Sequence, residues 1–147
     1  MTPYLILDGE LLHALKFAAE RGVDVSIIMP GIPDKKSAYY LAKTYYPTLL
    51  ASGVKIYEYT PGFVHAKIFV SDNSRAVVGQ STWITAVFII TLSGATYLYR
   101  TSSVVSIEED FQATKAKCHR VSVAEIENLP FHQKALGLLT RLVAPLM

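Results

Sequence analysis

Hydrophobic and polar positions change period several times along the chain, and these changes mark predicted strands and helices. Apolar runs bounded by turn-forming residues predict short strands, which cover residues 3–7, 23–29, 54–60, 64–72, 75–79 and 96–100. Apolar positions spaced three and four apart predict helices, which cover about 9–21, 37–53, 103–118 and 129–144, the last one amphipathic. Strands that alternate with helices in this way are typical of an α/β sandwich, here with a mixed β-sheet flanked by helices.

The ends of the predicted helices carry their own signals. Asp8 is placed to cap the first helix, and Gly22 follows where that helix ends. Pro47 lies inside the second predicted helix and is expected to kink or split it, because proline has no backbone N–H to donate. His119 is expected at the end of a helix, where a partly positive ring suits the helix dipole.

No linker, repeat or low-complexity stretch divides the chain, so residues 1–147 are expected to form a single domain. The sequence opens directly on an apolar run that is expected to be a buried strand. We therefore expect an incomplete domain, from which an upstream strand or a preceding domain is missing.

Composition narrows the classes of function. The 147 residues are 51% hydrophobic and carry a formal net charge of +2, which is too weakly basic to predict a nucleic-acid partner. The single cysteine, Cys118, excludes an internal disulfide, and no cluster of Cys and His residues predicts a metal site. No apolar run approaches the roughly 20 residues that a membrane-spanning helix needs, and the first residues do not have the pattern of a signal peptide.

Three residues in the middle of the chain suggest a site for phosphate chemistry. Side chains on a strand alternate between faces, so His65 and Lys67 are predicted to project from the same side. An imidazole attacks or protonates a phosphodiester, and a neighbouring ammonium holds the charged oxygens. Asp72 is a candidate to orient the imidazole or to tune its pKa. On spacing alone a structural histidine is the more common case, and His13 and His132 are expected at the surface or in an interface.

The stretch HAKIFVSDNSRAVVG resembles the first part of the phospholipase D superfamily motif, H-x-K-x4-D-x6-G-S-x-N, with His65, Lys67, Asp72 and Gly79 at the required intervals. The phrases TPYL, ALKFAAERGVDVSIIMPGIPDKK, YYPTLLASGVKIYEYTPGFVHAK and RLVAPLM are similar to those of bacterial cardiolipin synthases. The similarity covers nearly the whole chain except residues 80–93 and corresponds to the C-terminal half of such an enzyme. The resemblance implies a phospholipase D-like α/β sandwich and a site that needs neither metal nor organic cofactor.

The chain departs from the family pattern directly after the first half of the motif. Where the family continues with Ser-x-Asn, this chain has Gln80 and Thr82, and where the family has a Phe-Glu pair it has Leu92 and Ser93. Gln80 and Thr82 retain hydrogen-bonding groups and are candidates to bind phosphate at the degenerate positions. The lost acidic residue and the apolar run AVFIITL do not fit a polar site.

A shifted reading frame accounts for this departure. When residues 80–93 are back-translated with suitable synonymous codons and read from the last base of the Gly79 codon, they give SVNLDYRSLYHHFE. That sequence is similar to what the family carries here. We hypothesise that one base was lost near Gly79 and one gained near Gly94; ordinary divergence of a degenerate site is the alternative.

The resemblance implies a phosphatidyltransferase at the bacterial cytoplasmic membrane. It would make cardiolipin from two phosphatidylglycerol molecules through a phosphohistidine, on an anionic membrane surface. Members of the superfamily use two copies of the motif, so His65 would be the nucleophile or the general acid, and Lys67 would hold phosphate oxygens. This chain has one copy, and the other would come from a missing N-terminal half or from a second chain. The isolated chain is therefore expected to be inactive.

Two alternatives are left open. One is a dimeric nuclease of the same superfamily. The other is a non-catalytic lipid-surface or assembly module, in which Tyr39, Tyr40, Tyr45, Tyr46 and the segment 131–147 form an interfacial surface. The same residues also suit simple packing of the core.

Overall fold

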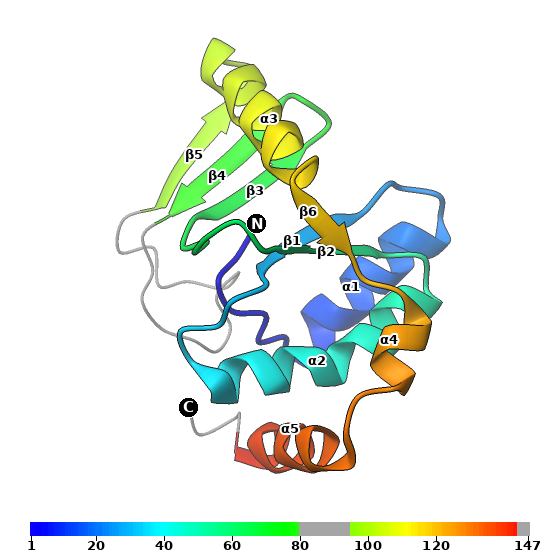
Figure 1. Ribbon diagram of the computed structural model, residues 1–147. Coiled ribbons are helices and arrows are strands. Elements are labelled where there is room, and N and C mark those ends of the chain that lie inside the picture. The colour runs from blue at the N-terminus through cyan, green and yellow to red at the C-terminus, as the bar shows by residue number, and fades with distance from the viewer. Residues whose placement is uncertain (80–94, 144–147) are drawn as a thin grey trace.

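The computed structural model describes residues 1–79 and 95–143, which form five helices and six strands (Figure 1). The helices are α1 (Gly9–Glu20), α2 (Lys36–Ala51), α3 (Ser102–Lys115), α4 (Val123–Glu127) and α5 (Phe131–Val143). The strands are β1 (Ser26–Pro30), β2 (Lys55–Tyr59), β3 (Lys67–Ser71), β4 (Arg75–Gly79), β5 (Ala95–Tyr99) and β6 (Cys118–Arg120). The predicted α/β class is confirmed.

The described strands form two three-stranded sheets. In the first, β2 lies between β1, which is parallel to it, and β6, which is antiparallel. The second is the antiparallel sheet β3-β4-β5, in which the predicted hairpin joins β3 to β4. Backbone hydrogen bonds from Thr2 N to Ile28 O (3.1 Å) and from Ile68 N to Met1 O (3.0 Å) connect β1 to β3. The first two residues therefore bridge the two sheets.

Residues 3–7 are buried in part but do not form the strand predicted for them. Leu5 and Leu7 enter the core, and the carbonyl of Leu7 accepts a hydrogen bond from the Tyr45 hydroxyl at 3.0 Å. The Tyr45 side chain, rather than the backbone of a neighbouring strand, thus donates to this carbonyl. An apolar run in the sequence does not distinguish these two cases. Asp8 then caps α1 as predicted, because its carboxylate accepts from the Leu11 N–H at 2.7 Å.

Helix α2 passes through Pro47 without a break, so the predicted split is wrong. Its buried face packs on β2 and α4 as part of the main core. The core residues on this face are Leu41, Ala42, Tyr45, Tyr46 and Leu49. Burial of several large apolar side chains outweighs the cost of about 3 kcal/mol that a proline imposes inside a helix. Figure 1 shows α2 between this sheet and α5.

The structure adds two elements after α3 that the sequence patterns did not predict. His119 lies in β6 rather than at a helix end, and its ring contacts the Glu125 carboxylate at 2.8 Å. The strand is short, so it leaves little periodicity to recognise. Helix α4 begins at a visible signal, since the Ser122 hydroxyl accepts from the Glu125 N–H at 3.3 Å and donates to its carboxylate at 2.9 Å. Ser122 is thus the N-cap of α4.

Glu58 is a buried carboxylate in the middle of β2, and it collects three partners from α2. Lys43 Nζ lies 2.5 Å from Oε1, and the Tyr46 hydroxyl donates to the same oxygen at 3.1 Å. The Tyr39 hydroxyl donates to Oε2 at 3.4 Å. The charge is thus paired and hydrogen-bonded, which is the condition for burying an ion without a large free-energy penalty.

The stability of the fold is expected to decrease above about pH 10, near the ordinary pKa of tyrosine. Burial raises the pKa of Tyr39, Tyr45 and Tyr46 above 10.0, most strongly for Tyr46, which also lies beside the Glu58 carboxylate. As the pH rises through the ordinary value, tyrosines of the unfolded chain lose protons that the folded chain retains, so the free energy of unfolding falls. Urea unfolding between pH 8 and 11 measures this. If the free energy of unfolding of a Tyr46→Phe variant fell as steeply with pH as that of the wild type, Tyr46 would not contribute to this pH dependence.

Candidate active site

His65 lies in the segment that enters β3, two residues before the strand begins at Lys67, and its side chain is exposed. The prediction that His65 stands on the strand is therefore wrong, because β3 begins only at Lys67. Strand alternation fixes the face on which Lys67 projects but not the direction of the imidazole. Two aromatic rings flank that imidazole instead.

The first ring belongs to Phe63 and is stacked on the imidazole, with centroids 5.6 Å apart and an interplanar angle of 23°. The second belongs to Tyr4 and meets the imidazole edge to face, at 6.4 Å and 87°. The Tyr4 hydroxyl donates to Asp34 Oδ2 at 2.6 Å, and Lys35 Nζ lies 5.7 Å from the centre of the Tyr4 ring. Burial, followed by the hydrogen bond and negative charge of Asp34, raises the pKa of Tyr4 to about 12.

Sheet topology explains why the loop with Asp34 and Lys35 lies near the segment with His65. The parallel strands β1 and β2 end at Pro30 and Tyr59, which are paired in register, so the loops that follow leave from the same edge. One loop contains Asp34 and Lys35, and the other leads to His65. Ligand sites of α/β folds form at this carboxyl edge. The phrases TPYL and PGIPDKK were visible in the sequence, but no pattern indicated that they meet beside His65.

Lys67 begins β3 and pairs with Gly79, which in turn pairs with Ala95 of β5. Lys67 and Phe69 share one face of this sheet, because residues two apart on a strand project to the same side. Phe69 is 43% exposed there. Helix α3 packs against all three strands of the sheet.

Asp72 lies at the other end of β3, in the turn that leads to β4. It is exposed, has a left-handed backbone conformation with φ 52°, and accepts a hydrogen bond from the Ser71 hydroxyl at 2.9 Å. Five residues of extended chain separate it from Lys67, which corresponds to roughly 16 Å. The described contacts of the imidazole are with Phe63 and Tyr4, so Asp72 is not seen in the orienting role predicted for it.

The other residues singled out from the sequence have different outcomes. Gln80, Thr82 and the rest of the departing segment 80–93 lie outside the described residues. His13 is exposed on α1, and the side chain of His132 is outside the description. Within residues 1–79 and 95–143, no group of three or more His, Cys, Asp or Glu side chains is placed to hold a metal ion.

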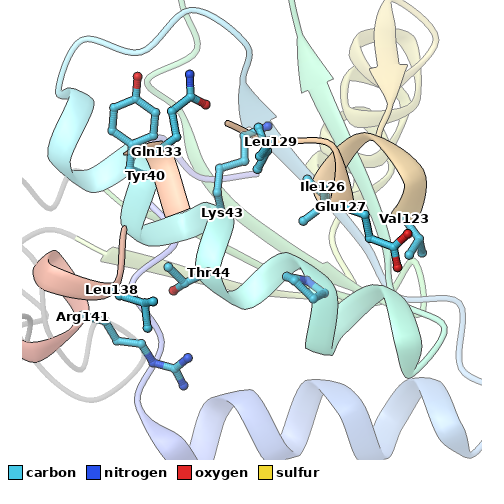
Figure 2. A pocket seen from close by; sticks show the side chains of 11 residues that line it. Tyr40, Lys43, Thr44, Val123, Ile126, Glu127, Leu129, Gln133, Leu138 and Arg141 are labelled. Atoms are coloured by element: carbon cyan, nitrogen blue, oxygen red, sulfur yellow. The ribbon is translucent and has the colours of Figure 1, made fainter. Parts of the chain in front are cut away.

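A cavity of about 320 Å³ lies between α2, α4 and α5 (Figure 2). Its walls are mainly apolar, with Pro47, Ile126 and Leu138 among them, and Arg141 also lines it. Helix α5 approaches α2 closely at Gly137, where an added Cβ would lie 2.8 Å from the Tyr40 carbonyl oxygen. His65, Lys67 and Asp72 do not line this cavity.

A family model and curated relatives both match this chain. The family described as "Cardiolipin synthase, PLD-like domain" matches residues 1–115. An uncharacterized protein of Streptococcus mutans is 53% identical over 147 residues, which are 100% of this chain and 32% of that protein. The cardiolipin synthase of Alkalihalophilus pseudofirmus is 37% identical over 146 residues, which are 99% of this chain and 29% of that protein.

Among solved structures, the phospholipase D family member Nuc from Salmonella typhimurium has a similar fold. The TM-score is 0.64 at 22% sequence identity, over 82% of this chain and 79% of that chain. By contrast, the chain spans only 29–32% of the two sequence relatives that it matches along its whole length.

Proposed function

The chain belongs to the family of cardiolipin synthases with a phospholipase D-like domain, and from that premise we propose that it supplies one half of a phosphatidyl-transfer site. The observation that carries the proposal is the position of His65, which is exposed at the carboxyl edge of the parallel strands and two residues before Lys67. Residues 1–147 form a single domain in this proposal, the second half of a two-motif enzyme.

The proposed reaction transfers a phosphatidyl group between two phosphatidylglycerol molecules. A histidine attacks phosphorus of the first molecule, the bond to the headgroup glycerol breaks, and the leaving oxygen takes a proton from a second histidine. That second histidine then removes a proton from a hydroxyl of the other phosphatidylglycerol, whose oxygen attacks the phosphohistidine and releases cardiolipin. Lys67 holds the phosphate oxygens as charge develops on them.

His65 takes one of the two histidine roles, and the general acid and base role is the one we assign. The second motif comes from an N-terminal half or from another chain. The isolated chain is therefore expected to lack turnover. Gln80 and Thr82 are proposed phosphate contacts at the degenerate positions of the motif.

A chimeric enzyme tests the proposal. In the Alkalihalophilus pseudofirmus cardiolipin synthase, this chain replaces the region that it matches, and conversion of phosphatidylglycerol to cardiolipin is measured by mass spectrometry of the lipids. A second chimera keeps the synthase's own residues at positions 80–93. We expect the second chimera to be active and the first to be much weaker. The proposal is wrong if the second chimera folds and binds membranes as the parent does but makes no cardiolipin.

The shifted-frame hypothesis for residues 80–93 has its own test. Sequencing the source DNA on both strands, together with mass spectrometry of the expressed protein, shows which reading is present. An in-frame gene that encodes GQSTWITAV, and a protein with that peptide, would rule out an error of sequencing.

We further propose that the chain associates with an anionic membrane surface. In the described part of the chain, no helix is both long and apolar enough to cross a bilayer. Helix α5 has instead an exposed apolar face, with Leu136 42%, Leu138 60% and Leu139 61% exposed. Arg141 is exposed on the same helix, where its cation suits a layer of anionic headgroups. This face also supports the alternative of a non-catalytic lipid-surface module.

Exchange of Leu138 and Leu139 for glutamine is expected to weaken binding to phosphatidylglycerol vesicles at least about tenfold, because two apolar side chains no longer enter the interface. Both side chains are largely exposed, so the fold should be retained. Flotation of the 147-residue chain with vesicles measures the effect. Val105→Gln on α3, at a residue that is 49% exposed, is the matched control. Equal losses for the control and the double variant would contradict a role of α5.

A further inference from the structure

The imidazole of His65 is held by ring contacts rather than by hydrogen bonds within residues 1–79 and 95–143. Phe63 covers one of its faces at 5.6 Å, and the Tyr4 ring stands against it at 6.4 Å and 87°. Edge-to-face and offset-stacked aromatic rings at these separations attract each other beyond the effect of burial. Two such contacts restrict the rotamers of a side chain that is otherwise exposed.

Tyr4 is itself held at both ends. Its hydroxyl donates to Asp34 Oδ2 at 2.6 Å. Its carbonyl accepts from the Thr2 hydroxyl at 2.7 Å, and the Thr2 N–H donates to Ile28 O of β1 at 3.1 Å. The Tyr4 ring is therefore connected to the sheet through its backbone and to the loop after β1 through its hydroxyl. It is a rigid support, whereas Phe63 is 52% exposed and lies on the same loop as His65.

We propose that Tyr4 and Phe63 are positioning residues for His65, and that Asp34 fixes Tyr4 in place. The inference rests on the catalytic role proposed for His65. Transfer of a phosphatidyl group needs the reacting nitrogen in line with the phosphorus or with the leaving oxygen, and a displacement of about 1 Å costs on the order of 100-fold in rate. The ring contacts select the orientation of the imidazole before the lipid binds. The segments TPYL and PGIPDKK thereby acquire a function in the site.

Nuclear magnetic resonance of the His65 ring in the 147-residue chain tests this inference directly. We expect Tyr4→Ala and Phe63→Ala to shift the ring Cε1 and Cδ2 signals of His65 and to change the proportion of its tautomers. His13 on α1 and His119 in β6 are internal controls whose signals should not move. Tyr4→Phe keeps the ring but loses the hydrogen bond to Asp34. Both Tyr4→Phe and Asp34→Asn should therefore shift the His65 signals less than Tyr4→Ala does. Phe17→Ala removes a 60% exposed ring on α1 and should leave His65 unchanged.

The active chimera supplies the second measurement. There, Tyr4→Ala should lower kcat about 10- to 100-fold with little change in KM, and Tyr4→Phe should restore most of the rate. Unchanged His65 signals in Tyr4→Ala and Phe63→Ala would overturn the inference, as would shifted signals together with an unchanged kcat. If neither chimera makes cardiolipin, the proposed function fails, while the spectra alone decide whether the two rings orient His65.

Discussion

Replacing Glu58 by alanine is expected to lower the free energy of unfolding by about 3–5 kcal/mol, the range for breaking a buried ion pair by removal of one partner. The carboxylate lies in the central strand of its sheet and is 9% exposed. Without it, Lys43 keeps a poorly solvated charge, and the hydroxyls of Tyr39 and Tyr46 lose their acceptor. A loss of this size is comparable with the whole stability of many small domains.

Urea unfolding followed by circular dichroism measures the effect, with two variants for comparison. Asp24→Ala breaks an exposed ion pair with Lys55 and should cost less than about 1 kcal/mol. Lys43→Met should cost less than Glu58→Ala, because both tyrosine hydroxyls still donate to the remaining carboxylate. If Glu58→Ala were no more destabilising than Asp24→Ala, the buried cluster would not contribute to the fold as described.

Replacing His65 by asparagine in the active chimera is expected to reduce cardiolipin formation by about 10²–10⁴-fold, since general acid and base catalysis by a positioned imidazole contributes that much. Asparagine is close in size to histidine, and the side chain is exposed, so the fold should not change. Lys67→Met should reduce the rate as well, because the developing charge on the phosphate loses its cation.

Steady-state conversion of phosphatidylglycerol, normalised to folded protein bound to the vesicles, is the measurement. His13→Asn changes an exposed histidine on α1 and is the control. A chimera with His65→Asn that keeps a rate within a factor of about three of its parent would show that His65 has no part in the chemistry. Loss of vesicle binding in the same variant would instead place His65 in lipid association.

Local patterns in the sequence predicted most of the elements around the site. The Asp8 cap, the end of α1 near Gly22 and the hairpin between β3 and β4 are set by interactions among residues close in sequence, and the structure confirms them. Residues 3–7 do not form the predicted strand, and α2 is not split at Pro47. In both places contacts with residues distant in the chain outweigh the local preference. The short strand β6 left too little periodicity to be recognised.

The contacts of the buried Glu58 could not be predicted from local sequence patterns either. A glutamate in a strand that alternates between half-buried and buried positions is expected to face water. Its partners lie 12 to 19 residues earlier, on α2, and only the packing of that helix on β2 brings them to the carboxylate. The sequence contains all four residues, but their spacing does not indicate the contact.

The sequence by itself determined the family and the motif, because the spacing of His65, Lys67, Asp72 and Gly79 and the surrounding phrases are properties of the linear chain. Only the tertiary structure decided which side chains meet. The carboxyl ends of the parallel strands β1 and β2 share an edge, and the loops leaving that edge carry Asp34 and His65. Tyr4, from the N-terminal segment, contacts both of them. The extended length of β3 separates Lys67 from Asp72. Neighbours in space follow from how the chain crosses the sheet, and no local pattern records that path.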